Sequence, residues 1–156
     1  MSANTLFLSS LMLIAGMGIP VMAALNTGLS QHLQSPMGAV LVLTLVAMII
    51  AVLGLTISGG PNLTAIGTTP PIYFFAGALF VLYIGSITFA APKIGLGTAV
   101  FYVLLGQLIS ASIIDHFGLW GSQISIITPK RLLGLAFMAL GVYLARKDVI
   151  PPVPHP

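Results

Sequence analysis

A long apolar run in the second half of the chain constrains the fold more than any other feature of the sequence. It extends from Ile94 to Ile114, is interrupted only by small residues, a tyrosine and a few polar side chains, and ends at Asp115-His116. About twenty apolar residues is the length of one helical crossing of a lipid bilayer. Trp120, which follows shortly after, is an aromatic residue of the kind enriched at the membrane surface. The run therefore predicts a transmembrane helix that surfaces near Asp115.

The composition extends this prediction to the whole chain. Of the 156 residues, 58% are apolar and 4% are charged, and the mean hydropathy is +1.13. A water-soluble domain of this size needs far more polar surface, so the sequence indicates an all-α polytopic membrane protein. The formal charge is +3, but the five basic residues stand mostly at the ends of apolar runs and form no patch. The bilayer is thus the expected partner, and nucleic acid is not.

Reactive side chains are scarce. The sequence has no cysteine, no cluster of histidines and acids at metal-binding spacing, and no nucleophile–base set beyond the lone Asp115-His116 pair. We therefore expect no cofactor, no metal and no enzymatic activity. No basic residue precedes the first apolar run, so a retained first crossing is expected in place of a cleaved signal.

Five apolar segments predict five transmembrane helices within a single domain, residues 1–150, followed by a Pro-rich tail, residues 151–156. Three of the expected starts carry a Ser/Thr-Pro cap signature, at Ser35-Pro36, Thr69-Pro70 and Thr128-Pro129. The expected helices span residues 6–29, 36–58, 71–90, 94–114 and 129–147. The apolar centre of the last one has only fourteen residues, but basic side chains at both ends can reach the lipid headgroups.

The first expected helix contains its own irregularity. Pro20 cannot donate a hydrogen bond to the carbonyl of Gly16, and Gly18 lies between them, so a bend is predicted here. Asn26 follows about two turns after this predicted bend, near the end of the same helix. A side-chain amide in hydrocarbon is costly without a partner.

Polar residues within the other helices complete a predicted substrate pathway. Gln107 and Ser110 share one face of the fourth helix, with Ala111 and Ile114. The candidate pathway residues are Asn26, Gln107 and Ser110, with the mid-helix hydroxyl of Tyr83 as a fourth. The alternative is that the amides form interhelical hydrogen bonds and serve packing only. Asp115 and His116 are a possible proton or polar site, or else ordinary charges at a helix end.

Small residues predict where helices approach closely. Gly106 and Ser110 have a small-xxx-small spacing, and Gly134 and Gly141, seven residues apart, share a face of the fifth helix.

The basic residues give almost no preferred orientation. With five crossings, Lys130 and Arg131 lie on one side of the membrane, and Lys93, Arg146 and Lys147 lie on the other. A difference of one basic residue between the two sides is too small for the positive-inside rule to set an orientation. The chain is therefore expected to insert in both orientations or to take its orientation from a partner, although one weakly preferred orientation is the alternative. An antiparallel pair would supply ten helices and the inverted symmetry of many transporters.

Several short motifs resemble one family. Ala91-Pro92-Lys93-Ile94-Gly95, Gly106-Gln107-Leu108 and Asp115-His116-Phe117-Gly118 are similar to the YdcZ-like branch of the drug/metabolite transporter superfamily, as are Gly18-Ile19-Pro20 and Arg131-Leu132-Leu133-Gly134. The resemblance implies a small bacterial inner-membrane protein with about five helices. It also implies an exporter or exchanger that works as an antiparallel assembly of two short chains, either a homodimer or a heterodimer with a sister chain. The inverted symmetry of such a pair is the kind that transporters use for alternating access.

The resemblance does not imply a substrate. Related four-helix multidrug transporters carry a glutamate in the first helix, and this sequence has no glutamate. A second possibility is a non-transporting subunit that assembles with a sister transporter chain and orients it.

Overall fold

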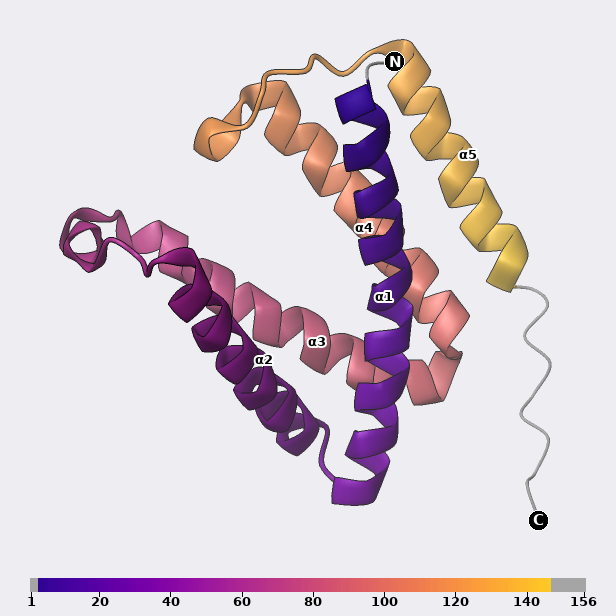
Figure 1. Ribbon diagram of the computed structural model, residues 1–156. Helices are drawn as coiled ribbons and strands as arrows, with labels where there is room; N and C mark the ends of the chain where they lie inside the picture. The colour runs from indigo at the N-terminus through magenta and orange to yellow at the C-terminus, as the bar shows by residue number, and fades with distance from the viewer. Residues whose placement is uncertain (1–2, 147–156) are drawn as a thin grey trace. The chain divides into compact units, whose positions relative to one another are not determined.

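The computed structural model describes residues 3–146, and the helical prediction is confirmed for them (Figure 1). No strand occurs in this range. The long helices are α1 Ala3–Leu33, α2 Pro36–Ser58, α3 Phe75–Ile94, α4 Leu96–Phe117 and α5 Pro129–Arg146. Three short 3-10 helices are η1 Leu63–Thr68, η2 Pro71–Phe74 and η3 Leu119–Gly121. The predicted tail at residues 151–156, together with Lys147 and Asp148, lies outside the described residues.

Four segments within residues 3–146 are long and apolar enough to cross a membrane: Asn4–Leu33, Pro36–Ser58, Pro71–Ile94 and Leu96–Phe117. The chain is thus an all-α membrane protein. The predicted fifth crossing does form a helix, α5, but it is not one of these four, because three of its eighteen residues are basic.

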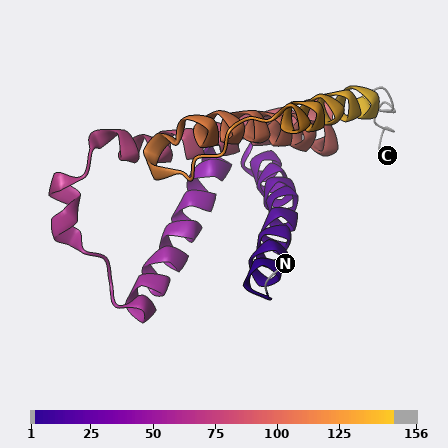
Figure 2. The same cartoon turned by 90° about the horizontal axis from the view of Figure 1, so that it is seen from above.

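The chain divides into two compact units, Met1–Pro92 and Lys93–Pro156. In the first unit, α1 and α2 pack as a hairpin. In the second, α4 and α5 lie side by side, with η3 in the connection between them (Figure 2). The single domain expected over residues 1–150 stays a prediction.

The turn between α1 and α2 is built as the sequence predicts. Ser35 is the N-cap of α2, its Oγ accepts a hydrogen bond from the N–H of Gly38 at 3.0 Å, and Pro36 is the first helical residue. α1 continues past the predicted end at residue 29, as far as Leu33. It stops at Gln34, which has a φ of +50°. Thr128 likewise caps α5, because its Oγ1 accepts from the N–H of Arg131 at 3.3 Å.

The boundary between α3 and α4 differs from the prediction. The expected helices at residues 71–90 and 94–114 leave a break around Pro92, but α3 runs through Pro92 and ends at Ile94. Proline removes one helical hydrogen bond and its ring crowds the carbonyl four residues earlier, yet α3 continues for two residues beyond Pro92. The reversal of the chain falls instead at Gly95, whose φ of +85° favours a residue without a Cβ. α3 also starts later than expected, since η2 separates it from the predicted cap at Thr69-Pro70.

Pro20 lies inside an uninterrupted α1. A Cβ added at Gly16 or Gly18 would meet no atom within 4 Å in the described residues. The bend at these three residues stays a prediction.

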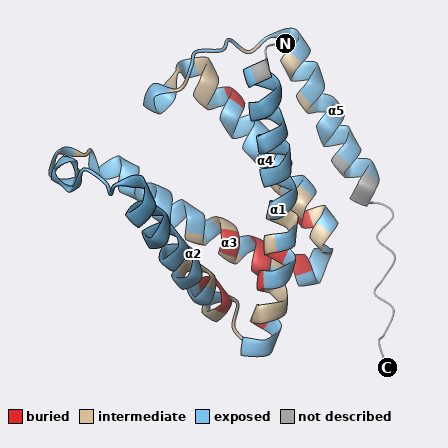
Figure 3. Cartoon of the chain, viewed as in Figure 1, coloured by how far each residue is buried: buried red, intermediate tan, exposed pale blue. Residues whose placement is uncertain are grey.

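The buried core is small and lies mainly in the first unit (Figure 3). The buried apolar side chains are Ala23, Ala39, Val40, Ile84, Ile87, Ala91 and Ala99. Most leucines, isoleucines and phenylalanines of the long helices are exposed. Such an exterior suits helices that face lipid or another membrane chain.

Candidate functional site

A buried hydrogen bond joins α1 to α3. Asn26 Nδ2 donates to Thr88 Oγ1 at 2.7 Å, across 62 positions of sequence. The two residues are 3% and 1% exposed, and Ser30, one turn after Asn26, is also buried. Thr88 lies beside the buried Ile84 and Ile87, so the pair sits in the most enclosed part of the first unit. Asn26, predicted as a pathway residue, is therefore placed at a polar centre inside the protein.

The hydrogen-bonding groups of this polar centre do not all have partners. Asn26 Oδ1 is buried and has no hydrogen-bond partner among the described residues. Rotating the amide by half a turn exchanges its two terminal atoms, so one of them remains unpaired in either orientation. A buried polar atom without a partner costs roughly 1–3 kcal/mol. Thr27 Oγ1 and Tyr83 Oη are in the same state, and both belong to the first unit.

Asn26 also lines a groove of about 450 Å³ between α1 and α2. The other lining residues are Gly18, Val21, Met22, Leu25, Leu29, Val42, Leu43 and Val46. Asn26 is thus the one polar residue in an otherwise apolar wall. A volume of this size falls within the range of small-molecule sites.

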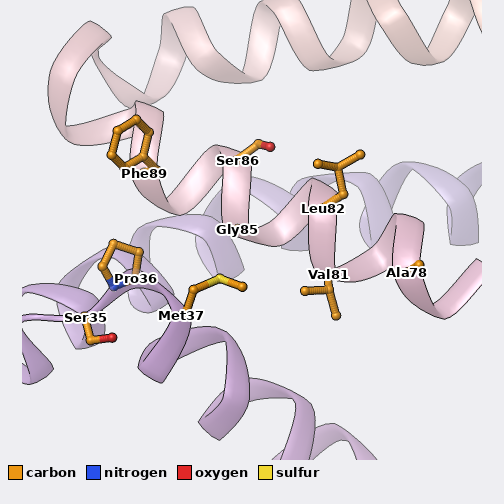
Figure 4. Close-up of a pocket in the computed structure, with 9 residues that line it drawn as sticks. All are labelled: Ser35, Pro36, Met37, Ala78, Val81, Leu82, Gly85, Ser86 and Phe89. Carbon is orange, nitrogen blue, oxygen red and sulfur yellow. The ribbon is translucent and has the colours of Figure 1, made fainter.

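A second groove, of about 640 Å³, lies between the start of α2 and α3 (Figure 4). It is lined by Ser35, Pro36, Met37, Ala78, Val81, Leu82, Gly85, Ser86 and Phe89. The Ser35 hydroxyl is already used by the N–H of Gly38, and Ser86 is exposed. This groove holds no buried unpaired group, so the groove at Asn26 is the stronger candidate.

The first unit carries no formal charge on its side chains. Residues 1–92 contain no Asp, Glu, Lys or Arg, and the first charged residue is Lys93. His32 is exposed at the end of α1, where its Nδ1 lies 3.0 Å from the carbonyl oxygen of Gly28. The polar centre therefore works through amide and hydroxyl groups alone.

Two predicted pathway residues, Gln107 and Ser110, lie on α4 in the second unit, and both are exposed. The buried hydroxyl of α4 is that of Ser112, which donates to the carbonyl of Leu108 at 2.7 Å. Gln107 and Ser110 thus present polar groups on the outer surface of α4, and their pathway role stays a prediction.

Asp115 and His116, the possible proton site, bond to the connection between α4 and α5 and to the start of α5. Asp115 Oδ2 forms an ion pair with Arg131 Nη2 at 3.0 Å, and its backbone carbonyl accepts from the N–H of Ser125 at 2.9 Å. His116 Nδ1 accepts from the N–H of Ile127 at 3.3 Å. Asp115 therefore pairs with Arg131 and not with His116, the partner that sequence adjacency suggested.

The glycines predicted to mark close helix packing have open surroundings. A Cβ built on Gly106, Gly134 or Gly141 would meet nothing within 4 Å in the described residues. These helix faces are open to packing by a further chain, and the close helix packing predicted at these glycines stays a prediction.

Thr88 and Thr27 were not singled out from the sequence, and Arg131 was expected only as a basic residue at the start of the fifth helix. Thr88 is flanked by apolar residues, and threonine is common in membrane helices, where its hydroxyl can bond to a carbonyl in the preceding turn. Its spacing of four from Ile84 places it on a core-facing stripe, which is the one signal that could have identified it.

The described residues form an all-α, multi-pass membrane protein with a buried, uncharged polar centre at Asn26 and Thr88. A family model described as "Putative inner membrane exporter, YdcZ" matches residues 7–144. The chain belongs to this family, which confirms the resemblance seen in its motifs. It is accordingly a multi-pass protein of the inner membrane, and its family is one of membrane transporters and not of enzymes. No curated protein and no solved structure matched the chain.

Proposed function

We propose that this chain is one half of a small-molecule exporter or exchanger whose pathway passes the Asn26–Thr88 pair. The observation that carries the proposal is the buried amide of Asn26, which has one atom bonded to Thr88 and the other unpaired beside a groove. Interhelical hydrogen bonds in membranes contribute only about 0.6 kcal/mol on average. That gain does not offset an unpaired amide atom, whereas a substrate that bonds to it would.

The second half would be another copy of the chain or a sister chain, inserted antiparallel. For this arrangement α5 must cross the membrane as the fifth helix. Its eighteen residues extend about 27 Å at 1.5 Å per residue, close to the hydrocarbon thickness. Lys130 and Arg131 lie in its first turn and can reach the headgroups. Five crossings from each chain then give ten helices, and alternating access follows from the inverted symmetry.

The remaining predicted residues take their roles from this assembly. Gln107 and Ser110 are exposed on α4, so the second chain or the pathway would cover them. The buried hydroxyl of Tyr83 offers a further contact to the substrate. Gly134 and Gly141, whose surroundings are open, would receive a helix of the partner.

The test is transport by the purified full chain in proteoliposomes, screened over a panel of radiolabelled metabolites. Asn26→Leu keeps the side-chain shape and removes both amide groups, and we expect it to abolish transport. Thr88→Val removes only the bond to Asn26 and should reduce transport less. Gln31→Leu is the matched control, because Gln31 is an exposed amide on the same helix. It should leave transport unchanged.

Unchanged transport by Asn26→Leu, with normal assembly, would refute the pathway. Loss of assembly together with transport would assign Asn26 to packing. A parent chain that moves nothing by itself, but restores transport to a co-purified sister chain, would favour the orienting-subunit alternative.

A further inference from the structure

We infer that the groove at Asn26 takes an uncharged, mainly apolar molecule that carries a hydroxyl group. The inference rests on the proposed function, because it names the class of substrate for that site.

The absence of charge in the first unit determines the charge of the ligand. An ion taken from water into a low-dielectric site is stable only beside a counter-charge or a metal. Residues 1–92 contain no Asp, Glu, Lys or Arg, and their one histidine, His32, is exposed at the end of α1 and does not line the groove. Asp115, the one carboxylate in the described part of the chain, already has Arg131 as its counter-ion at 3.0 Å. A neutral ligand avoids this penalty, and an ionised analogue of the same shape incurs it.

The groove wall determines the rest of the ligand. Eight of its nine lining residues are glycine, valine, leucine or methionine, so most of the ligand surface must be apolar. Met22 adds an adaptable side chain that accepts ligands of different shape.

The single polar position in the wall determines the polar group of the ligand. Asn26 is 3% exposed and offers one unpaired amide atom. A hydroxyl can both donate and accept a hydrogen bond, so it satisfies this atom in either orientation of the amide. One hydroxyl on an apolar body therefore matches the one buried, unpaired polar atom carried by a residue that lines the groove.

Photo-crosslinking to the full chain in lipid nanodiscs tests this inference without a transport assay. Four benzophenones differ in one substituent: 4-hydroxymethyl, 4-carboxylate, 4-aminomethyl as its ammonium ion, and 4-methyl. Methionine reacts readily with such probes, and Met22 lines the groove, whereas Met48 on α2 is exposed outside it. The ratio of labelling at Met22 to labelling at Met48, measured by mass spectrometry, corrects for partition of each probe into lipid.

We expect the ratio to be highest for the hydroxymethyl probe, with each ionic probe at least about ten-fold lower because of the cost of burying its charge. The 4-methyl probe should be lower by roughly 2- to 10-fold, the value of one hydrogen bond. Asn26→Leu should bring the hydroxymethyl probe down to the 4-methyl value, and Gln31→Leu should not.

An ionic probe that matches the hydroxymethyl probe in the unmodified chain would overturn the inference, and this comparison needs no variant. A 4-methyl probe with an equal ratio would also overturn it, because the groove would then be filled by lipid-like hydrocarbon. If the crosslinking result holds while Asn26→Leu still transports, the transport pathway fails and the binding site stands. If transport requires Asn26 but the ions label equally, only the neutral-ligand inference fails.

Discussion

The ion pair between Asp115 and Arg131 allows a quantitative test of where the end of α4 lies. The two charged atoms are 3.0 Å apart, and the side chains are 34% and 31% exposed, respectively. Ion pairs this accessible to water contribute about 0.2–1 kcal/mol, because solvent screens them. A pair enclosed in hydrocarbon would instead cost roughly 3–5 kcal/mol when one partner is removed. Removing one charge thus discriminates between a membrane-surface position and a buried one.

The perturbations are Asp115→Asn, Arg131→Gln and the double variant. We expect a coupling free energy of about 0.5–1 kcal/mol that decreases as salt is added. The backbone carbonyl of Asp115 still accepts from the N–H of Ser125 at 2.9 Å, so the loop should persist in each variant. Transport should be unchanged by Asp115→Asn, because Asp115 is not among the residues that line the groove at Asn26.

Unfolding by sodium dodecyl sulfate, followed by the fluorescence of Trp120, is the assay. Trp120 is the single tryptophan of the chain and lies in η3, inside the connection that the ion pair fastens. Lys130→Gln is the control, since Lys130 is an exposed cation next to Arg131. A coupling above about 3 kcal/mol would refute the surface position. Loss of transport in Asp115→Asn with normal stability would restore Asp115 as a proton site.

Three further predictions concern stability and topology. Gly118→Ala should destabilise the chain by roughly 1–2 kcal/mol, because Gly118 has a φ of +60° and a Cβ would come within 2.8 Å of Ile124 Cγ1. Gly121→Ala is the control, because Gly121 also has a positive φ but a Cβ there would meet nothing within 4 Å. It should cost less free energy of unfolding in the same Trp120 assay. Ser35→Ala should cost about 1 kcal/mol through loss of the α2 cap, and an equal melting temperature would contradict this. Two lysines added to the connection between η3 and α5, or to the C-terminal tail, should fix opposite orientations, read by topology reporters at both ends.

The local features of the fold could be predicted because their causes are local. Ser35-Pro36 and Thr128-Pro129 act as caps through side-chain and backbone geometry within one turn. The end of α3 was missed because two local signals compete there. Pro92 disfavours helix, but the positive φ at Gly95 fixes where the chain turns.

The site could be predicted only in part, because pairing between helices is not encoded in the periodicity of either helix. Asn26 was identified as an amide in hydrocarbon, yet Thr88, 62 positions later, resembles any threonine of a membrane helix. The sequence predicted Arg131 as an interfacial anchor, whereas the structure pairs it with Asp115, because the loop between α4 and α5 brings the two residues together. Helical periodicity placed Gln107 and Ser110 on one face, but it does not show what covers that face.

The absence of charge in residues 1–92 links the orientation of the chain to the chemistry of its site. A charged residue near α1 to α3 would bind an ionic substrate and would also help to determine which side of the membrane each loop occupies. With none present, topology depends on Lys93 and the basic residues that follow it. In the proposed five-crossing arrangement these are divided two against three between the sides of the membrane. The site then has only amide and hydroxyl groups with which to recognise a ligand. A chain that gains an orienting charge beside α1 is therefore expected to change its ligand preference as well, whereas charge added after α5 should change orientation alone.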